Sequence, residues 1–141
     1  MKGIVVVAVS LALSTALAQP FCEPVPLDLE FPAGFVGAYE VVGKDPVNGD
    51  PYVATLQVSE QEGFYGLRKS IRERAAVQGR AQFQRCGPDR ILILAISYED
   101  ATPSAGSCVV DTDGNNYYRV SCRTVGGKDG GRGLESWFQV E

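Results

Sequence analysis

The fold of this chain is decided by residues 51–72, which read PYVATLQVSEQEGFYGLRKSIR. Apolar and polar residues alternate through most of this stretch, and a period of two is the pattern of a β-strand with one buried face. Glu62-Gly63 is typical of a tight turn. The sequence therefore predicts two antiparallel strands, at 51–60 and 63–72, joined as a hairpin.

The end of this hairpin is ambiguous, because Leu67, Ile71 and Ala75 also recur at the spacing of a helix. The aromatic pair Phe64-Tyr65 favours a strand, and no capping residue precedes a helix start. We therefore predict a strand, with a short helical turn near 73–76 as an alternative.

The same alternation recurs along most of the chain, in short blocks separated by Gly, Asp, Asn and Pro clusters. Short connections between successive strands indicate an up-and-down meander, and closure removes the open edges that promote association. We predict an all-β fold, a single antiparallel up-and-down β-barrel of about eight strands within residues 35–141. The predicted strands are 35–43, 51–60, 63–72, 76–86, 90–99, 106–112, 117–124 and 134–140.

A glycine-rich segment precedes the last predicted strand. Residues 126–133 contain five glycines in eight residues, and glycine loses more chain entropy on ordering than any other residue. We predict a mobile loop there.

Several turn glycines and strand aromatics resemble those of a known class of proteins. Gly37-Ala38-Tyr39 resembles the Gly-x-Trp opening of lipocalins and related calycins, with Tyr in place of Trp. The wider pattern is similar to that of small exported bacterial β-barrel proteins of unassigned function. This resemblance implies a calycin-like barrel and brings no active site with it. The residues that carry the wider pattern are Gly37, Tyr39, Val41, Gly43, Asp45, Pro46, Tyr52, Leu56, Tyr65, Leu67 and the segment 133–137.

The N-terminal segment indicates export. Lys2 precedes an apolar run that ends in the small-residue exit at Ala18, so residues 1–18 are predicted to be a cleavable signal peptide. The run is too short to cross a bilayer as a helix, and no transmembrane segment is predicted later in the chain. Residues 19–34 contain four prolines and are predicted to form an extended leader. The expected location is secreted or periplasmic.

Four cysteines in an exported chain favour two disulfides over metal ligation. Cys108 and Cys122 fall on matching faces of two strands around a turn centred on Asn115. We therefore predict Cys108–Cys122, which leaves Cys22 to pair with Cys86.

Composition excludes several kinds of chemistry. The chain has no histidine, which removes the usual general base and metal ligand. Asp111 to Asn116 begins like a calcium loop, but its twelfth position is Cys122 instead of Glu, and a hairpin turn explains the same residues. The net charge is −4 and becomes −5 when Lys2 leaves with the signal peptide, which argues against nucleic acid. No cofactor, metal or catalytic residue is predicted; acids such as Glu99 keep enzyme activity open only as a third hypothesis.

Two hypotheses for binding remain. In the first, the barrel holds a small apolar or amphipathic ligand, with Tyr39, Tyr65 and Trp137 lining the cavity. The same aromatic residues could instead fill a small core, and a domain of this size favours that interpretation.

In the second hypothesis, an exterior cationic stripe docks an anionic macromolecule, as in an envelope or inhibitor-type protein. Residues 63–90 carry seven basic residues against two acidic ones. Cross-strand pairing with neighbouring acids is the alternative interpretation of this charge. The stripe is assigned to Arg68, Lys69, Arg72 and Arg74.

Overall fold

The computed structural model describes residues 21–27, 34–112 and 117–140. Its regular elements in these ranges are all β-strands. They are β1 (Cys22–Pro24), β2 (Gly37–Lys44), β3 (Pro51–Gln61), β4 (Phe64–Ile71), β5 (Val77–Cys86), β6 (Ile91–Glu99), β7 (Ser104–Thr112), β8 (Tyr118–Gly126) and β9 (Gly131–Gln139).

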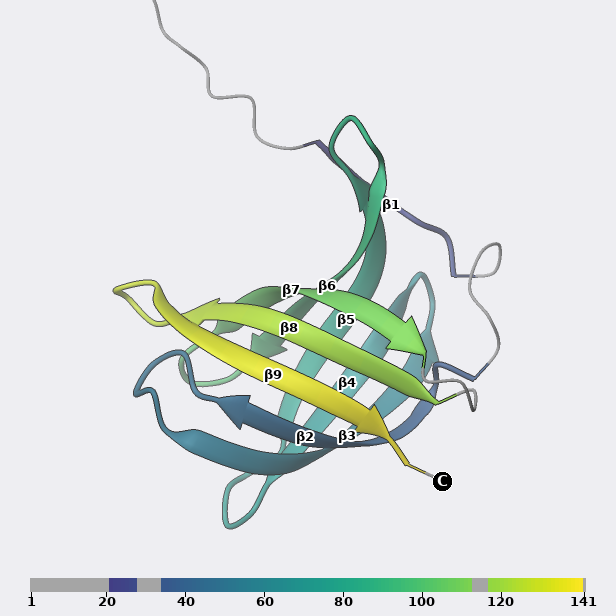
Figure 1. Ribbon diagram of the computed structural model, residues 1–141. Helices are drawn as coiled ribbons and strands as arrows, with labels where there is room; N and C mark the ends of the chain where they lie inside the picture. The colour runs from purple at the N-terminus through teal and green to yellow at the C-terminus, as the bar shows by residue number, and fades with distance from the viewer. Residues whose placement is uncertain (1–20, 28–33, 113–116, 141) are drawn as a thin grey trace, which may run out of the picture.

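Strands β2 to β9 form a closed antiparallel barrel (Figure 1). Each strand pairs with the next along the chain, and β9 pairs with β2 to close the cylinder. The prediction of an eight-stranded up-and-down barrel is confirmed, and the strand ends lie within three residues of the predicted ones. Closure satisfies the backbone hydrogen bonds that an open meander would leave at its two edges.

A three-stranded arm extends from one end of the barrel. Figure 1 shows the tip of the β5–β6 hairpin projecting beyond the other strands, with β1 beside it. Strand β1 pairs with β5 through Cys22 and Cys86, which form a disulfide. The second disulfide joins Cys108 to Cys122, which face each other across β7 and β8. Both predicted disulfides are confirmed.

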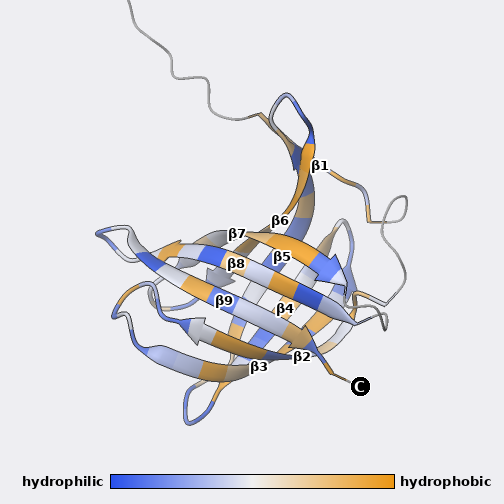
Figure 2. Ribbon diagram, in the orientation of Figure 1, coloured by the Kyte–Doolittle hydropathy of each residue, from blue (hydrophilic) through white to orange (hydrophobic). Residues whose placement is uncertain are grey.

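The strands alternate between an inner and an outer face, as Figure 2 shows by the change of hydropathy along them. Inward positions of all eight barrel strands build one continuous core. At the end that the chain enters before β2, the ring of Phe35 fills the axis of the barrel. Four aromatic rings surround it at centroid distances of 5.0 to 6.0 Å, from Tyr39, Tyr65, Phe83 and Tyr118.

One local prediction is wrong, and one alternative is not observed. Only residues 127–130 of the glycine-rich segment form a turn, while Gly131 to Gly133 belong to β9. These glycines permit a close approach, because a Cβ atom at Gly133 would lie 2.4 Å from the carbonyl oxygen of Lys44. The helical turn considered near 73–76 is absent from this described segment. Glu73 instead has a φ of 63°, which turns the chain between β4 and β5.

The predicted signal peptide, most of the predicted leader, and residues 113–116 of the proposed turn lie outside the described residues. In the ranges that are described, no helix has the length and hydropathy that crossing a bilayer requires.

Candidate functional site

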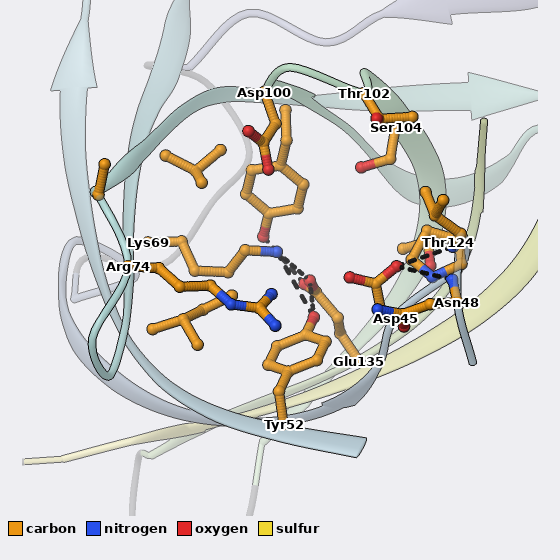
Figure 3. A pocket seen from close by; sticks show the side chains of 16 residues that line it. Asp45, Asn48, Tyr52, Lys69, Arg74, Asp100, Thr102, Ser104, Thr124 and Glu135 are labelled. Atoms are coloured by element: carbon orange, nitrogen blue, oxygen red, sulfur yellow. Dashed lines mark hydrogen bonds and ion pairs between the residues drawn. The ribbon is translucent and has the colours of Figure 1, made fainter. Parts of the chain in front are cut away.

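The barrel has a polar cavity at the end opposite Phe35. Its volume is 340 Å³, at the lower end of the range of roughly 300 to 1,000 Å³ that is usual for small-molecule sites. Three connections border it, between β2 and β3, between β4 and β5, and between β6 and β7. Figure 3 shows charged and hydroxyl-bearing side chains directed into this space. We call it the mouth cavity.

The floor of the mouth cavity is organised around Glu135, an inward residue of β9 that is 3% exposed. Its Oε1 atom accepts hydrogen bonds from the Tyr52 hydroxyl and from Lys69 Nζ, the latter at 2.5 Å. Its Oε2 atom accepts from the Tyr98 hydroxyl and from Trp137 Nε1, both at 2.9 Å. Each carboxylate oxygen thus accepts two hydrogen bonds, which accounts for all four acceptor positions of the carboxylate.

Lys69 occupies the inward position on β4 that follows Leu67, and it is 7% exposed. Its Nζ atom lies 3.6 Å from the centroid of the Tyr98 ring, in addition to its contact with Glu135. A buried ion pair has to offset the loss of hydration of both charges, and it does so only when further polar contacts surround it. Here the tyrosine hydroxyls and the Tyr98 ring supply those contacts.

The two tyrosines of the floor are held as hydrogen-bond donors. Burial raises the pKa of Tyr98 well above the ordinary tyrosine value, and the negative charge of Glu135 and the hydrogen bond to it raise the pKa further. The same causes, in the same order, raise the pKa of Tyr52. Both hydroxyls therefore keep their protons at neutral pH and donate them to Glu135.

Glycines on neighbouring strands make room for these tyrosines. Gly43 is the cross-strand partner of Tyr52, and Gly79 is the partner of Tyr98. A Cβ atom at Gly43 would lie 2.4 Å from the Tyr52 ring, and one at Gly79 would lie 2.7 Å from the Tyr98 ring. The rings therefore lie flat over backbone that has no side chain, and this fixes the direction of their hydroxyls.

The rim of the mouth cavity carries three more charges, from Asp45, Arg74 and Asp100. The Oδ1 atom of Asp45 accepts a hydrogen bond of 2.8 Å from the Val47 amide, and Oδ1 of Asp100 accepts one of 2.6 Å from the Ala101 amide. Arg74 is exposed, and its guanidinium forms no ion pair with any described residue. Figure 3 shows Arg74 and Asp45 reaching into the cavity from different sides.

Thr124 adds an unsatisfied group to the wall of the mouth cavity. It is 3% exposed, and its Oγ1 atom is the one buried side-chain polar atom without a hydrogen-bond partner in the described part of the chain. Buried polar groups in proteins are nearly always paired, so an orphan atom beside a cavity suggests a partner that the chain itself does not supply.

The aromatic residues expected to line a cavity lie elsewhere. Tyr39, Tyr65 and Trp137 are each at most 4% exposed, and none of them borders the mouth cavity. Tyr39 and Tyr65 pack around Phe35, while Trp137 lies beneath Glu135. The expectation that they line the cavity is corrected: their rings fill the barrel, as the alternative interpretation held.

The expected cationic stripe is also divided. Arg68 and Arg72 are exposed on the outside, whereas Lys69 points into the barrel and Arg74 stands at the mouth. The assignment of Lys69 to the exterior was wrong, because successive strand residues face opposite sides. Lys69 lies two residues after Leu67 and therefore faces the same side of the strand. The sequence alone indicates this inward position.

Sequence reasoning did not single out Tyr52, Tyr98, Thr124 or Glu135 as site residues. Parity alone places Glu135 on the same face as Trp137, which is a strong signal for an inward acid. The convergence of four side chains from β3, β4, β6 and β9 depends on how the barrel closes, and no local pattern encodes it.

Comparison with models of known protein families, with curated protein sequences and with solved structures finds no match for this chain.

Proposed function

We propose that this protein works by binding a small polar molecule in the mouth cavity. The observation that carries the proposal is the buried Lys69–Glu135 pair, with both oxygens of Glu135 hydrogen-bonded, beneath a charged rim. Building such a floor costs desolvation free energy that an apolar filling would avoid. Its presence at the end of the barrel that holds a cavity supports a role in recognition. The proposal includes no catalytic step.

The polarity of the cavity changes the expected ligand. The sequence favoured an apolar or amphipathic molecule held by aromatic rings. The rings of Tyr39 and Tyr65 pack at the other end, and the mouth cavity presents charges and hydroxyls instead. A ligand with several hydrogen-bonding groups therefore fits this chemistry better than an aliphatic chain.

Export to an oxidising compartment, secreted or periplasmic, belongs to the same proposal. Two disulfides support it, since such bonds persist mainly outside the cytosol. A relationship to calycin-like proteins of bacterial origin is likewise proposed, and the eight-stranded up-and-down barrel is what supports it.

Docking of an anionic macromolecule remains the alternative. Its surface is reduced to Arg68 and Arg72 with Arg74 at the edge, because Lys69 lies inside the barrel. Among the described residues, no contact or groove favours this surface over the mouth cavity.

The fluorescence of Trp137 tests the proposal directly. It is the only tryptophan of the chain, and its indole donates to Glu135 in the cavity floor. We expect mixtures of amino acids, monosaccharides or nucleosides to change its emission and raise the melting temperature, while 1-anilinonaphthalene-8-sulfonate and palmitate do neither. A ligand that binds only the native state must stabilise it.

A matched pair of variants locates the binding. Ser104→Phe places a ring in the mouth cavity, whereas Ser107→Phe places the same ring on the outer face of β7. The first variant should abolish the response and the second should keep it. Binding that survives Ser104→Phe, or a response to the apolar probes alone, contradicts the proposal.

A further inference from the structure

The charges of the mouth cavity do not balance. Its charged lining residues are two cations and three anions, and Lys69 and Glu135 neutralise each other in the floor. Arg74, Asp45 and Asp100 remain on the rim, which leaves one uncompensated negative charge. A ligand that matches this rim needs one anionic group and two cationic groups.

The rim carboxylates are held in place with acceptor capacity to spare. Oδ1 of Asp45 is engaged by the amides of Val47 and Asn48, and Oδ1 of Asp100 by the amide of Ala101. In both residues Oδ2 receives no hydrogen bond from any described residue. These backbone contacts fix the carboxylates before a ligand arrives, so less conformational entropy is lost on binding.

Arg74 supplies the opposite charge from another side of the cavity. Figure 3 shows its guanidinium pointing inward, beside the pair formed by Lys69 and Glu135. Since no described carboxylate pairs with it, its planar donors are open to a carboxylate, the group that a guanidinium binds in a bidentate manner.

Stacking of a sugar ring has no comparable support. The Tyr98 ring is the aromatic face closest to the ion pair, and Lys69 Nζ covers it at 3.6 Å. The Tyr52 ring lies against the backbone of Gly43 on one side and is 5.2 Å from the same ammonium group. Recognition in this cavity therefore depends on charge and hydrogen bonding.

We propose that the mouth cavity binds a small molecule with one carboxylate and two amino groups, the charge pattern of a basic amino acid such as lysine or ornithine. The carboxylate pairs with Arg74, and the two ammonium groups pair with Asp45 and Asp100. This inference rests on the proposed function and names its ligand class.

Titration calorimetry with four probes tests each part of this pattern. L-Lysine carries all three groups, cadaverine lacks the carboxylate, 6-aminohexanoate lacks the α-amino group, and L-glutamate reverses the net charge. We expect L-lysine to bind most tightly and each single omission to weaken binding about tenfold, the usual contribution of a hydrogen bond to a charged group. Added salt should weaken binding of L-lysine.

Variants then assign the groups. Arg74→Gln should weaken L-lysine about tenfold and should not weaken cadaverine, because cadaverine has no carboxylate to lose its partner. Asp45→Asn and Asp100→Asn keep the oxygen that accepts from the backbone, and each should reduce the affinity for L-lysine by a similar factor. Arg68→Gln, on the outer face of the same hairpin, is the control and should change nothing.

The outcomes separate this inference from the proposed function. If L-glutamate or a neutral monosaccharide binds as tightly as L-lysine, or if Arg74→Gln weakens L-lysine and cadaverine equally, the ligand class is wrong and the cavity remains a binding site. If no polar probe of any class binds, both proposals fail together.

Discussion

The two ends of the barrel interior are filled in opposite ways. Around Phe35, four aromatic rings pack at tilted or edge-to-face angles and leave the axis closed. Around Glu135, hydrogen bonds replace close packing of rings and a cavity remains above them. Eight strands enclose just enough space for side chains. The inward side chains therefore decide whether one end of the barrel is closed or keeps a cavity.

The comparison indicates how the two ends should differ in stability and in the proposed binding. The aromatic end contributes apolar burial, which is the dominant favourable contribution to folding. At the polar end, the loss of hydration of Lys69 and Glu135 reduces that stability. Changes at one end should therefore alter stability alone, and changes at the other should alter stability together with binding.

The largest effect is expected from Phe35→Ala. Removing a fully buried phenylalanine leaves a cavity and should lower the free energy of unfolding by about 4 kcal/mol. Urea denaturation followed by Trp137 fluorescence measures this loss. Phe21→Ala is the matched control, because Phe21 is 72% exposed and its removal should change the stability little. A small loss for Phe35→Ala would show that the aromatic cluster around Phe35 is not an independent source of stability.

Glu135→Gln should follow, with a loss of about 3 kcal/mol, because it leaves Lys69 buried without a counter-charge. Glu40→Gln on the exposed face of β2 is the control and should stay close to the parent protein. Neutralising both partners, as Lys69→Met with Glu135→Gln, should recover much of the stability, since no isolated charge remains and the amide oxygen can still accept hydrogen bonds from the floor. A double variant as unstable as the single one would contradict this account of the floor.

A smaller loss is expected from Gly79→Ala. Its methyl group would meet the Tyr98 ring and the carbonyl of Ser97, and such overpacking costs about 2 kcal/mol. The shift should also weaken the Tyr98 hydrogen bond to Glu135, so ligand binding should fall with stability. Gly66→Ala on β4 is the control, because the nearest atom there is the hydroxyl of Ser59, which can rotate away. Equal effects of the two changes would rule out this role for Gly79.

Alkaline pH should affect both ends, and the loss for each single tyrosine over one pH unit is smaller than the losses given above. Burial raises the pKa of Tyr39 at the plugged end and, with help from Glu135, that of Tyr98 at the mouth. Both hydroxyls stay protonated in the folded protein at pH values at which the same tyrosines ionise in the unfolded chain, where the tyrosine pKa is about 10. Their contribution to the free energy of unfolding is therefore complete below pH 10. Above pH 10 it falls by about 1.4 kcal/mol per pH unit for each tyrosine.

Urea midpoints measured across this alkaline range check the prediction. Tyr39→Phe and Tyr98→Phe should each make the decline less steep. In Glu135→Gln, the tyrosines of the mouth should ionise at lower pH while Tyr39 does not change. A stability that stays flat above pH 10 would contradict the buried state of these hydroxyls.

Most of the fold was predictable because it follows from local rules. A period of two defined the strands, short turns defined their order, and matching strand faces gave Cys108–Cys122. The prediction of a mobile loop over the glycine-rich segment considered only the entropy of glycine. It did not include the close approach of Gly133 to Lys44, which closure of the barrel imposes. Sequence reasoning could see a flexible residue there but not the chain lying against it.

The candidate site was less accessible. Lys69 was assigned to the outer surface because it is charged, and Glu135 was not assigned to any site. The alternation of the strands nevertheless places both side chains inside the barrel. Burial of one charge is so costly that it becomes credible only with its partner in view. These two residues lie 66 positions apart, and only closure of the barrel brings them together.

The arm built from β1, β5 and β6 gives the molecule a point of fragility. Among the described strands, β1 covers one side of the hairpin tip, while Ile91 and its neighbours have no strand on their other side. Reducing the Cys22–Cys86 bond would leave β1 held only by its pairing with β5 and the ion pair between Glu23 and Arg90, and its release would uncover a second unpaired edge next to exposed Ile91. Such edges recruit other chains, so the redox state of one bond should control whether this protein remains dispersed or aggregates.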